Sequence, residues 1–101
     1  MTATQYTNDG QQRILALLQV LAGHEVTGLT PKQIAEHQGC APALVTRDLA
    51  NLKQAGFAEQ VPETHYWRLS PELVQISIKH GVALGRAQAK LDDIKNRFSR
   101  T

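Results

Sequence analysis

Residues 30–52 read TPKQIAEHQGCAPALVTRDLANL, and this stretch predicts two short helices separated by a tight turn. Thr30 can cap the first helix, Pro31 suits its first position, and Gln33 can return a hydrogen bond to the cap, which together form a capping box. Gly39 supplies the left-handed residue that ends a helix, and Pro42 stands where a second helix begins. We therefore expect one helix over residues 31–38 and another over residues 42–55.

Each of these two helices has one apolar side. Its residues are Ile34 and Ala35 on the first helix, and Val45, Leu49 and Leu52 on the second. Two such helices joined by a tight turn form a helix-turn-helix. The opposite face of the second helix is short and flat, ends in a guanidinium fork, and fits a DNA major groove. This face consists of Ala43, Thr46, Arg47 and Ala50, and we expect Asp48 at its border.

A third helix is predicted before this pair. Asn8 or Asp9 can cap it, and Gly23 can end it after Ala22. Its apolar residues fall on one face, so the helix should lie across the core; they are Ile14, Leu17, Leu18 and Leu21. Residues 1–9 are expected to form a flexible N-terminal arm, and residues 24–29 a connector that can include a short strand.

After Gly56 the sequence pattern changes from helical to extended. Residues 57–61 and 66–69 are predicted strands, and residues 62–65 the turn between them. Trp67 and Leu69 share one face of the returning strand, and we interpret Trp67 as a core residue rather than a base-stacking one. A hairpin directly after a recognition helix is a wing. The predicted fold class is therefore α+β, mainly helical: a winged helix-turn-helix domain over residues 10–70, with three helices and a β-hairpin wing.

Residues 71–101 predict a long C-terminal amphipathic helix, which begins at the start signal of Ser70, Pro71 and Glu72. Its apolar residues alternate between spacings of three and four, as in a coiled-coil seam of about two heptads. The seam consists of Leu84, Ala87, Leu91, Ile94 and Phe98. It can pack back on the winged domain or pair with a second subunit. We favour a homodimer, because the three helices and the wing already account for their own apolar faces.

The composition fits one small domain of 101 residues, with 42% hydrophobic and 20% charged residues. No apolar run approaches the roughly 20 residues of a membrane helix, and the polar start lacks the pattern of a signal peptide. Residues 1–78 carry five basic against seven acidic side chains, whereas residues 79–101 carry six against two. The basic flank of the C-terminal helix consists of Lys90, Lys95, Arg97 and Arg100.

The residues do not assemble into a catalytic or metal site. Cys40 is the single cysteine, which excludes an internal disulfide and fits a reducing cytoplasm. Cys40 and His37 offer only two metal ligands, and paired carboxylates, a phosphate-binding glycine loop and a nucleophile-base pair are all missing. We therefore expect a cytoplasmic binding protein, without enzymatic activity, metal or cofactor.

The order of these segments resembles the N-terminal DNA-binding domain of IclR-type transcriptional regulators over roughly residues 10–75. The resemblance rests on the turn glycine, the Val-x-Arg and Leu-x-x-Leu positions, the Gly-Phe entry to the wing, the Pro-Glu-Thr tip and the closing aromatic-Arg-Leu-x-Pro. These positions are Gly39, Val45, Arg47, Leu49, Leu52, Gly56, Phe57, Pro62, Glu63, Thr64, Trp67, Arg68, Leu69 and Pro71. Members of that family continue into a large ligand-binding domain that is missing here, so no small-molecule effector is implied. His65 stands where that wing often has glycine.

We expect sequence-specific binding of double-stranded DNA by a small dimeric transcriptional regulator, bacterial or phage-encoded. Residues 42–55 would read the major groove while the wing contacts the DNA backbone. The predicted DNA-binding residues are Lys32, Ala43, Thr46, Arg47, Lys53, His65 and Arg68. For Arg47 the alternative is an ion pair with Asp48 or another nearby acid. For the whole chain the alternative is a winged-helix protein-protein interaction module that docks through the C-terminal helix; no membrane partner is expected.

Overall fold

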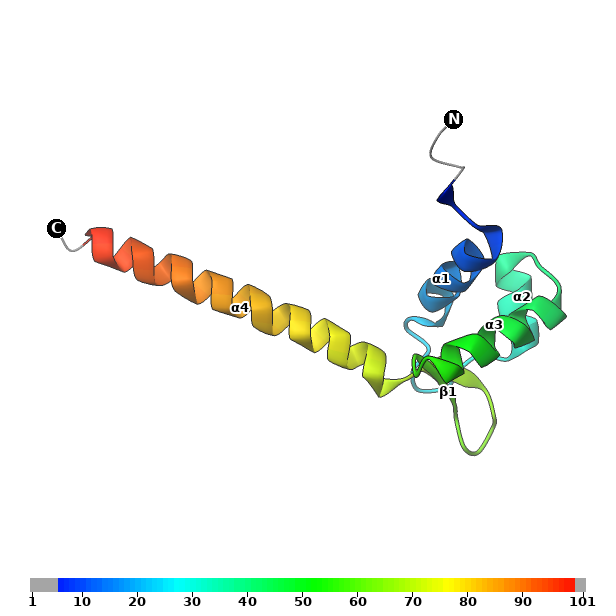
Figure 1. Ribbon diagram of the computed structural model, residues 1–101. Helices are drawn as coiled ribbons and strands as arrows, with labels where there is room; N and C mark the ends of the chain where they lie inside the picture. Colours follow the sequence, from blue (N-terminus) through cyan, green and yellow to red (C-terminus); the bar gives the residue numbers. More distant parts are fainter. Residues whose placement is uncertain (1–5, 100–101) are drawn as a thin grey trace. The chain divides into compact units, whose positions relative to one another are not determined.

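The computed structural model describes residues 6–99, and these divide after Pro71 into two compact units. The first unit contains helices α1, α2 and α3 and the strands β1 and β2; the second is formed by helix α4 (Figure 1). Residues 1–5 of the predicted arm and Arg100 of the predicted basic flank lie outside the described residues. The predicted mainly helical α+β architecture is confirmed.

The helices of the first unit start and end at the predicted signals. They are α1 Asp9–Leu21, α2 Pro31–Gln38 and α3 Pro42–Gln54. The side chain of Asn8 caps α1 by accepting a hydrogen bond from the Gln11 amide. At α2 the Thr30 hydroxyl accepts from the Gln33 amide at 3.1 Å, and the Gln33 side chain accepts from the Thr30 amide at 2.9 Å. The capping box read from the sequence is therefore confirmed.

Strands β1 Ala58–Gln60 and β2 Trp67–Leu69 form an antiparallel pair, in which Glu59 lies opposite Arg68. The strands are shorter than predicted: Phe57 lies in a bend before β1, and residues 61 and 66 at the tip are not part of either strand. At the wing tip His65 adopts a left-handed backbone conformation, with φ 63°. Leu29 adds an antiparallel bridge to Trp67, so the expected short strand in the connector is reduced to one residue.

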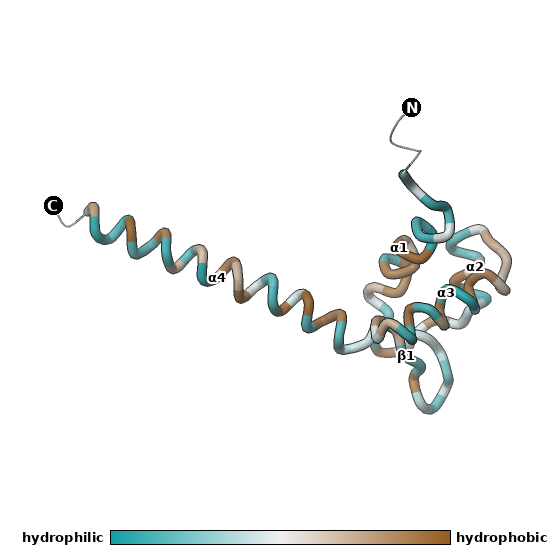
Figure 2. The backbone as a smooth tube through the Cα atoms, in the orientation of Figure 1, coloured by the Kyte–Doolittle hydropathy of each residue, from teal (hydrophilic) through white to brown (hydrophobic). Residues whose placement is uncertain are grey.

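The core lies where the three helices and the base of the wing meet, and Figure 2 shows apolar segments on each of these helices. Its buried members are Leu17, Leu21, Leu29, Ile34, Ala35, Val45, Leu49, Leu52 and Ala58. All of them except Leu29 and Ala58 belong to the apolar faces predicted for the helices, whereas the predicted Ile14 and Leu18 are only partly buried. Trp67 and Leu69 are partly buried against this cluster, as their shared face predicts. The Ser70 hydroxyl donates a hydrogen bond to the Gly56 carbonyl, which ties the end of β2 to the segment that follows α3. This hydrogen bond and the packing of the core together fix the wing relative to α3.

Helix α4 spans Pro71–Ser99 and continues through Gly81 and Gly85 without a break. Taken by itself, it presents its apolar residues to solvent: Leu84, Leu91 and Ile94 are 58%, 56% and 40% exposed. Brown and teal residues recur along its whole length in Figure 2. Among the described residues, no helix is both long and apolar enough to cross a membrane.

Candidate nucleic-acid interface

The outward face of α3 is the central feature of the candidate interface. Ala43, Thr46 and Arg47 are all exposed on it, as predicted. The Thr46 hydroxyl donates a hydrogen bond to the Pro42 carbonyl one turn earlier, at 3.1 Å. This bond uses the hydroxyl proton, so the oxygen of the exposed Thr46 side chain is still able to accept a hydrogen bond. Helix α3 lacks a side-chain cap, and the Leu44 and Val45 amides of its first turn donate to the Ala41 carbonyl instead.

Asp48 does not lie at the border of this face, and that part of the expectation is wrong. Its side chain is turned into the first unit and the residue is only 4% exposed. The Arg13 guanidinium of α1 holds it through two hydrogen bonds, from Nε to Oδ2 at 2.6 Å and from Nη2 to Oδ1 at 3.0 Å. The hydrogen-bonded carboxylate raises the pKa of Arg13 above its already high ordinary value. This pair joins α1 to α3.

The inward position of Asp48 decides the charge of the α3 surface. Asp48 is the acidic residue of this helix, and its charge is neutralised inside the unit. The exposed residues of α3 therefore include the cations Arg47 and Lys53 and no acid. The alternative ion pair between Arg47 and Asp48 is wrong, because Arg13 takes both carboxylate oxygens. Within residues 6–99 the structure records no ion pair to the Arg47 guanidinium.

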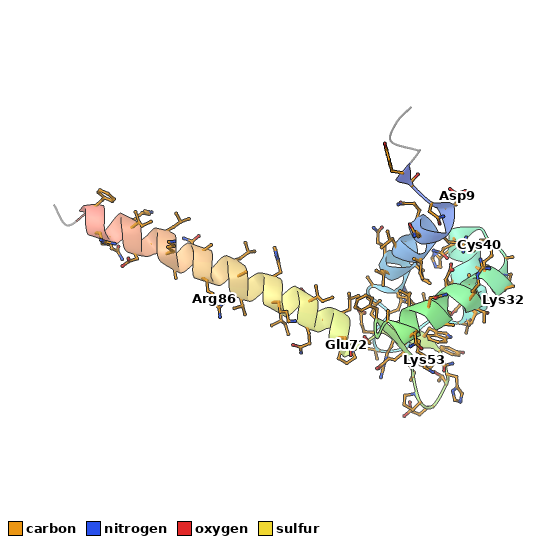
Figure 3. All side chains as sticks on the ribbon, in the orientation of Figure 1. Asp9, Lys32, Cys40, Lys53, Glu72 and Arg86 are labelled. Carbon is orange, nitrogen blue, oxygen red and sulfur yellow. The ribbon has the colours of Figure 1, made fainter. Side chains whose placement is uncertain are left out.

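Further basic side chains flank α3. Lys32 is exposed at the start of α2, and Lys53 is exposed in the last turn of α3; both are labelled in Figure 3. His65 is exposed at the wing tip, and the Gln60 side chain donates a hydrogen bond to its carbonyl at 3.2 Å. The left-handed backbone at His65 explains how the wing turns at a position where related wings often have glycine.

Arg68 differs from the other predicted site residues because its guanidinium is already engaged. Its Nε and Nη2 both lie 2.8 Å from Oε2 of Glu59, the residue opposite it in the hairpin. Its Nη1 donates a longer hydrogen bond, of 3.4 Å, to the Glu25 carbonyl. Arg68 thus links the two strands of the wing to the connector after α1, and it is half-buried rather than fully exposed.

The sequence reasoning missed Arg13, Asp48 and Glu59 as residues that shape the interface. A signal for Asp48 was present, because position 48 follows Val45 by three residues and precedes Leu52 by four, which puts it on the apolar face of the helix. The identity of its partner had no local signal, since Arg13 is 35 residues away in the chain. The pairing of Glu59 with Arg68 could be recognised only once the register of the hairpin was known.

Solved structures share this fold. An IclR transcriptional regulator from Alicyclobacillus acidocaldarius is 23% identical, with a TM-score of 0.66, over 74% of this chain. A second IclR regulator, from Silicibacter, is 23% identical with a TM-score of 0.64 over 72% of this chain. The chain spans 30% and 28% of the lengths of these two proteins. The expected resemblance to IclR-type regulators is therefore confirmed at the level of the fold.

A third similar structure is the Zalpha domain of Cyprinid herpesvirus 3 ORF112, described in its complex with Z-DNA. It is 24% identical with a TM-score of 0.53, and the match covers 58% of this chain and 93% of the Zalpha domain. No protein-family model and no curated protein sequence matches this chain. The winged-helix architecture of the first unit is thus shared with small and large proteins alike.

Proposed function

We propose that this chain binds double-stranded DNA in a sequence-specific manner, as a small dimeric transcriptional regulator. Helix α3 enters the major groove and the wing lies on the DNA backbone. The observation that carries this proposal is the outward face of α3, on which Thr46 and Arg47 are exposed while Asp48 is bound inward by Arg13. A carboxylate that faced the groove would repel the DNA phosphates. The ion pair with Arg13 instead holds the Asp48 carboxylate inside the unit.

Arg47 is the proposed base-reading residue, because a free guanidinium fork can donate two parallel hydrogen bonds to O6 and N7 of guanine. Ala43 and Thr46 lie on the same face and offer methyl groups and a hydroxyl to base edges. Lys32, Lys53 and His65 are proposed phosphate contacts, since all three are exposed around α3. Arg68 has a mainly architectural role here, because Glu59 holds its guanidinium in the wing.

The similar structures support DNA as the partner. Two of them are named as transcriptional regulators, and the third is described on Z-DNA. The dimer is supported by the exposed seam of α4, which is apolar and needs a partner surface. Two copies would present two α3 helices to a site with two-fold symmetry. The proposed activity of this chain is binding, without a chemical step.

The test is the affinity of the full chain for a fluorescent duplex selected from random sequences, measured by anisotropy at several salt concentrations. Arg47→Ala should weaken binding to the selected duplex by about 10- to 100-fold, as expected for the loss of one bidentate base contact. Arg47→Lys keeps the charge but loses the fork, so it should bind unselected DNA normally and lose preference for the selected sequence.

Arg86→Ala is the matched control, because it removes the same charge from an exposed position of α4. It should reduce affinity far less than Arg47→Ala does. If Arg47→Ala and Arg86→Ala weaken binding equally for every duplex, the groove-reading role of α3 is wrong. If neither the wild-type chain nor the variants bind any duplex, DNA is not the partner.

A further inference from the structure

The exposed seam of α4 extends further than the stretch from Leu84 to Phe98. Continuing its alternating spacing toward the N-terminus reaches His80, Ser77 and Leu73. The full seam then has eight positions along Pro71–Ser99: Leu73, Ser77, His80, Leu84, Ala87, Leu91, Ile94 and Phe98. Its large apolar residues are Leu73 and Leu84 in the N-terminal half and Leu91, Ile94 and Phe98 in the C-terminal half, whereas both of its polar residues lie in the N-terminal half. This uneven distribution restricts how two such helices can pair.

The residues that flank the seam are also unevenly distributed. The flanking positions in the N-terminal half are uncharged: Val74, Ile76, Gly81 and Ala83. Those in the C-terminal half are Gln88, Lys90, Lys95 and Arg97, of which three are cations. Asp93 lies 3.9 Å from Arg97 within the same helix. Because both side chains are more than two-thirds exposed, Asp93 neutralises little of the positive charge of Arg97. One half of the helix edge is therefore basic and the other half neutral.

In a parallel pair of α4 helices, each seam residue would face the same residue of the second copy, and the basic flanks would lie side by side. Lys90 of one helix would lie beside Lys95 of the second copy, and the reverse contact would repeat this repulsion. The seam would place Ala87 against Ala87, which leaves a gap, and His80 against His80. The flank charges therefore repel each other in this orientation, and the Ala87 and His80 layers pack poorly.

An antiparallel pair resolves both problems in one register. With Leu84 opposite Ala87 of the second copy, Ile94 lies opposite Ser77 and Leu91 opposite His80, so these layers join a large apolar side chain to a smaller or polar one. The remaining layer joins Phe98 to Leu73. In the same register Lys90 flanks Ala83 of the second copy and Lys95 flanks Val74. The aliphatic stems of these lysines can cover the apolar flank while their ammonium groups reach water. A shift by one heptad would instead bring Lys90 against Lys90.

We propose that α4 binds α4 of a second copy of this chain in an antiparallel pair, in the register that sets Leu84 opposite Ala87. This inference deepens the homodimer part of the proposed function and rests on it. The interaction surface is the eight-position seam, and its specificity comes from the separation of basic and neutral flanks between the two halves of the helix.

Disulfide trapping on the full chain tests the orientation. In a Cys40→Ala background, Ser77→Cys and Ile94→Cys are made in separate chains, one of which carries a mass tag, and the two are mixed under mild oxidation. The antiparallel register brings positions 77 and 94 together, whereas two copies of position 77 lie about 26 Å apart along the helix axis. A disulfide requires Cα atoms within about 7 Å. The mixed cross-link should therefore exceed either cross-link between identical chains by at least about tenfold.

Predominant cross-linking of Ser77→Cys to itself would show a parallel pair and overturn the proposal. A monomeric mass of the untagged wild-type chain at micromolar concentration, without any cross-link, would overturn it as well. Neither measurement contains DNA, so a failure here is distinguishable from a failure of duplex binding, which the Arg47 variants report.

A second pair of variants tests the charge argument at one position. Ala83→Glu places an acid beside Lys90 of the second copy twice per dimer, and Ala83→Lys places a cation there. The dimer dissociation constant at low salt, measured by sedimentation, should be about tenfold lower for Ala83→Glu than for Ala83→Lys. The difference should shrink at high salt. Equal dissociation constants for the two variants would contradict the proposed register.

Discussion

The close approach of Gly28 to the wing gives a prediction that the sequence could not supply. Gly28 has φ +76°, and a Cβ at this position would lie 2.9 Å from the Trp67 carbonyl oxygen and 2.9 Å from Cβ of Tyr66. The next residue, Leu29, exchanges two main-chain hydrogen bonds of 2.8 Å with Trp67. Gly28→Ala must therefore either strain its own backbone or push β2 away from the connector.

The expected loss has three parts. The left-handed backbone costs an alanine about 1–2 kcal/mol. Displacing a packed backbone by a new methyl group costs about 1–3 kcal/mol. Weakening one of the Leu29–Trp67 hydrogen bonds costs about 1 kcal/mol. Gly28→Ala should thus lower the free energy of unfolding by about 3–5 kcal/mol, since these effects act at the same place and overlap in part.

Gly39→Ala is the matched control, because Gly39 has φ +66° and a Cβ there would meet nothing within 4 Å. It should lose only the backbone part, about 1–2 kcal/mol. Urea unfolding followed by Trp67 fluorescence measures both variants, and Trp67 is the single tryptophan of the chain. Equal destabilisation of the two variants would refute the reasoning, because it would show that β2 yields to the new methyl group at no cost. A separation of about 2 kcal/mol would confirm it, equivalent to roughly 8–16 °C in melting temperature.

Two further predictions concern the contacts that hold α1, α2 and α3. Arg13→Ala should lower the melting temperature more than Asp48→Ala does. Arg13→Ala leaves the buried Asp48 carboxylate without its counter-ion, whereas Asp48→Ala leaves a guanidinium that can turn to water. A thermal scan in which Asp48→Ala lowers the melting temperature more would contradict this prediction. Thr30→Ala should reduce the free energy of unfolding in urea by about 1 kcal/mol, with Thr30→Ser close to wild type, because the capping box needs the hydroxyl and not the methyl group. An unchanged Thr30→Ala midpoint would mean that the cap contributes nothing.

The sequence was sufficient for the helices because their signals are local. Thr30, Gln33 and Gly39 lie within one helix and its caps, and the hydrogen bonds they form join residues three or four positions apart. The apolar faces followed from the same helical period, and the buried residues Leu17, Ile34 and Leu49 are the ones that this period selected. The hairpin was also predictable from its change of period, although β1 is one residue shorter at each end and β2 begins one residue later than predicted.

The candidate site was only partly predictable. Arg47 and Thr46 were correctly expected on the exposed face of α3, because a helix with one buried side must expose the other. Their use in binding DNA stays a prediction. Arg68 was expected to be available to DNA, but its register partner Glu59 holds it, and a register is a property of two strands together.

The sequence by itself determined the element order, the helix ends, the apolar core and the seam of α4, since each of these depends on residues a few positions apart. Tertiary structure alone decided that Asp48 turns inward to Arg13 and that Gly28 lies against Trp67. The physical reason is distance along the chain: these partners are 35 and 39 residues apart, and only packing of the core brings them within contact. The inward turn of Asp48 leaves α3 with an exposed face that carries cations and no acid.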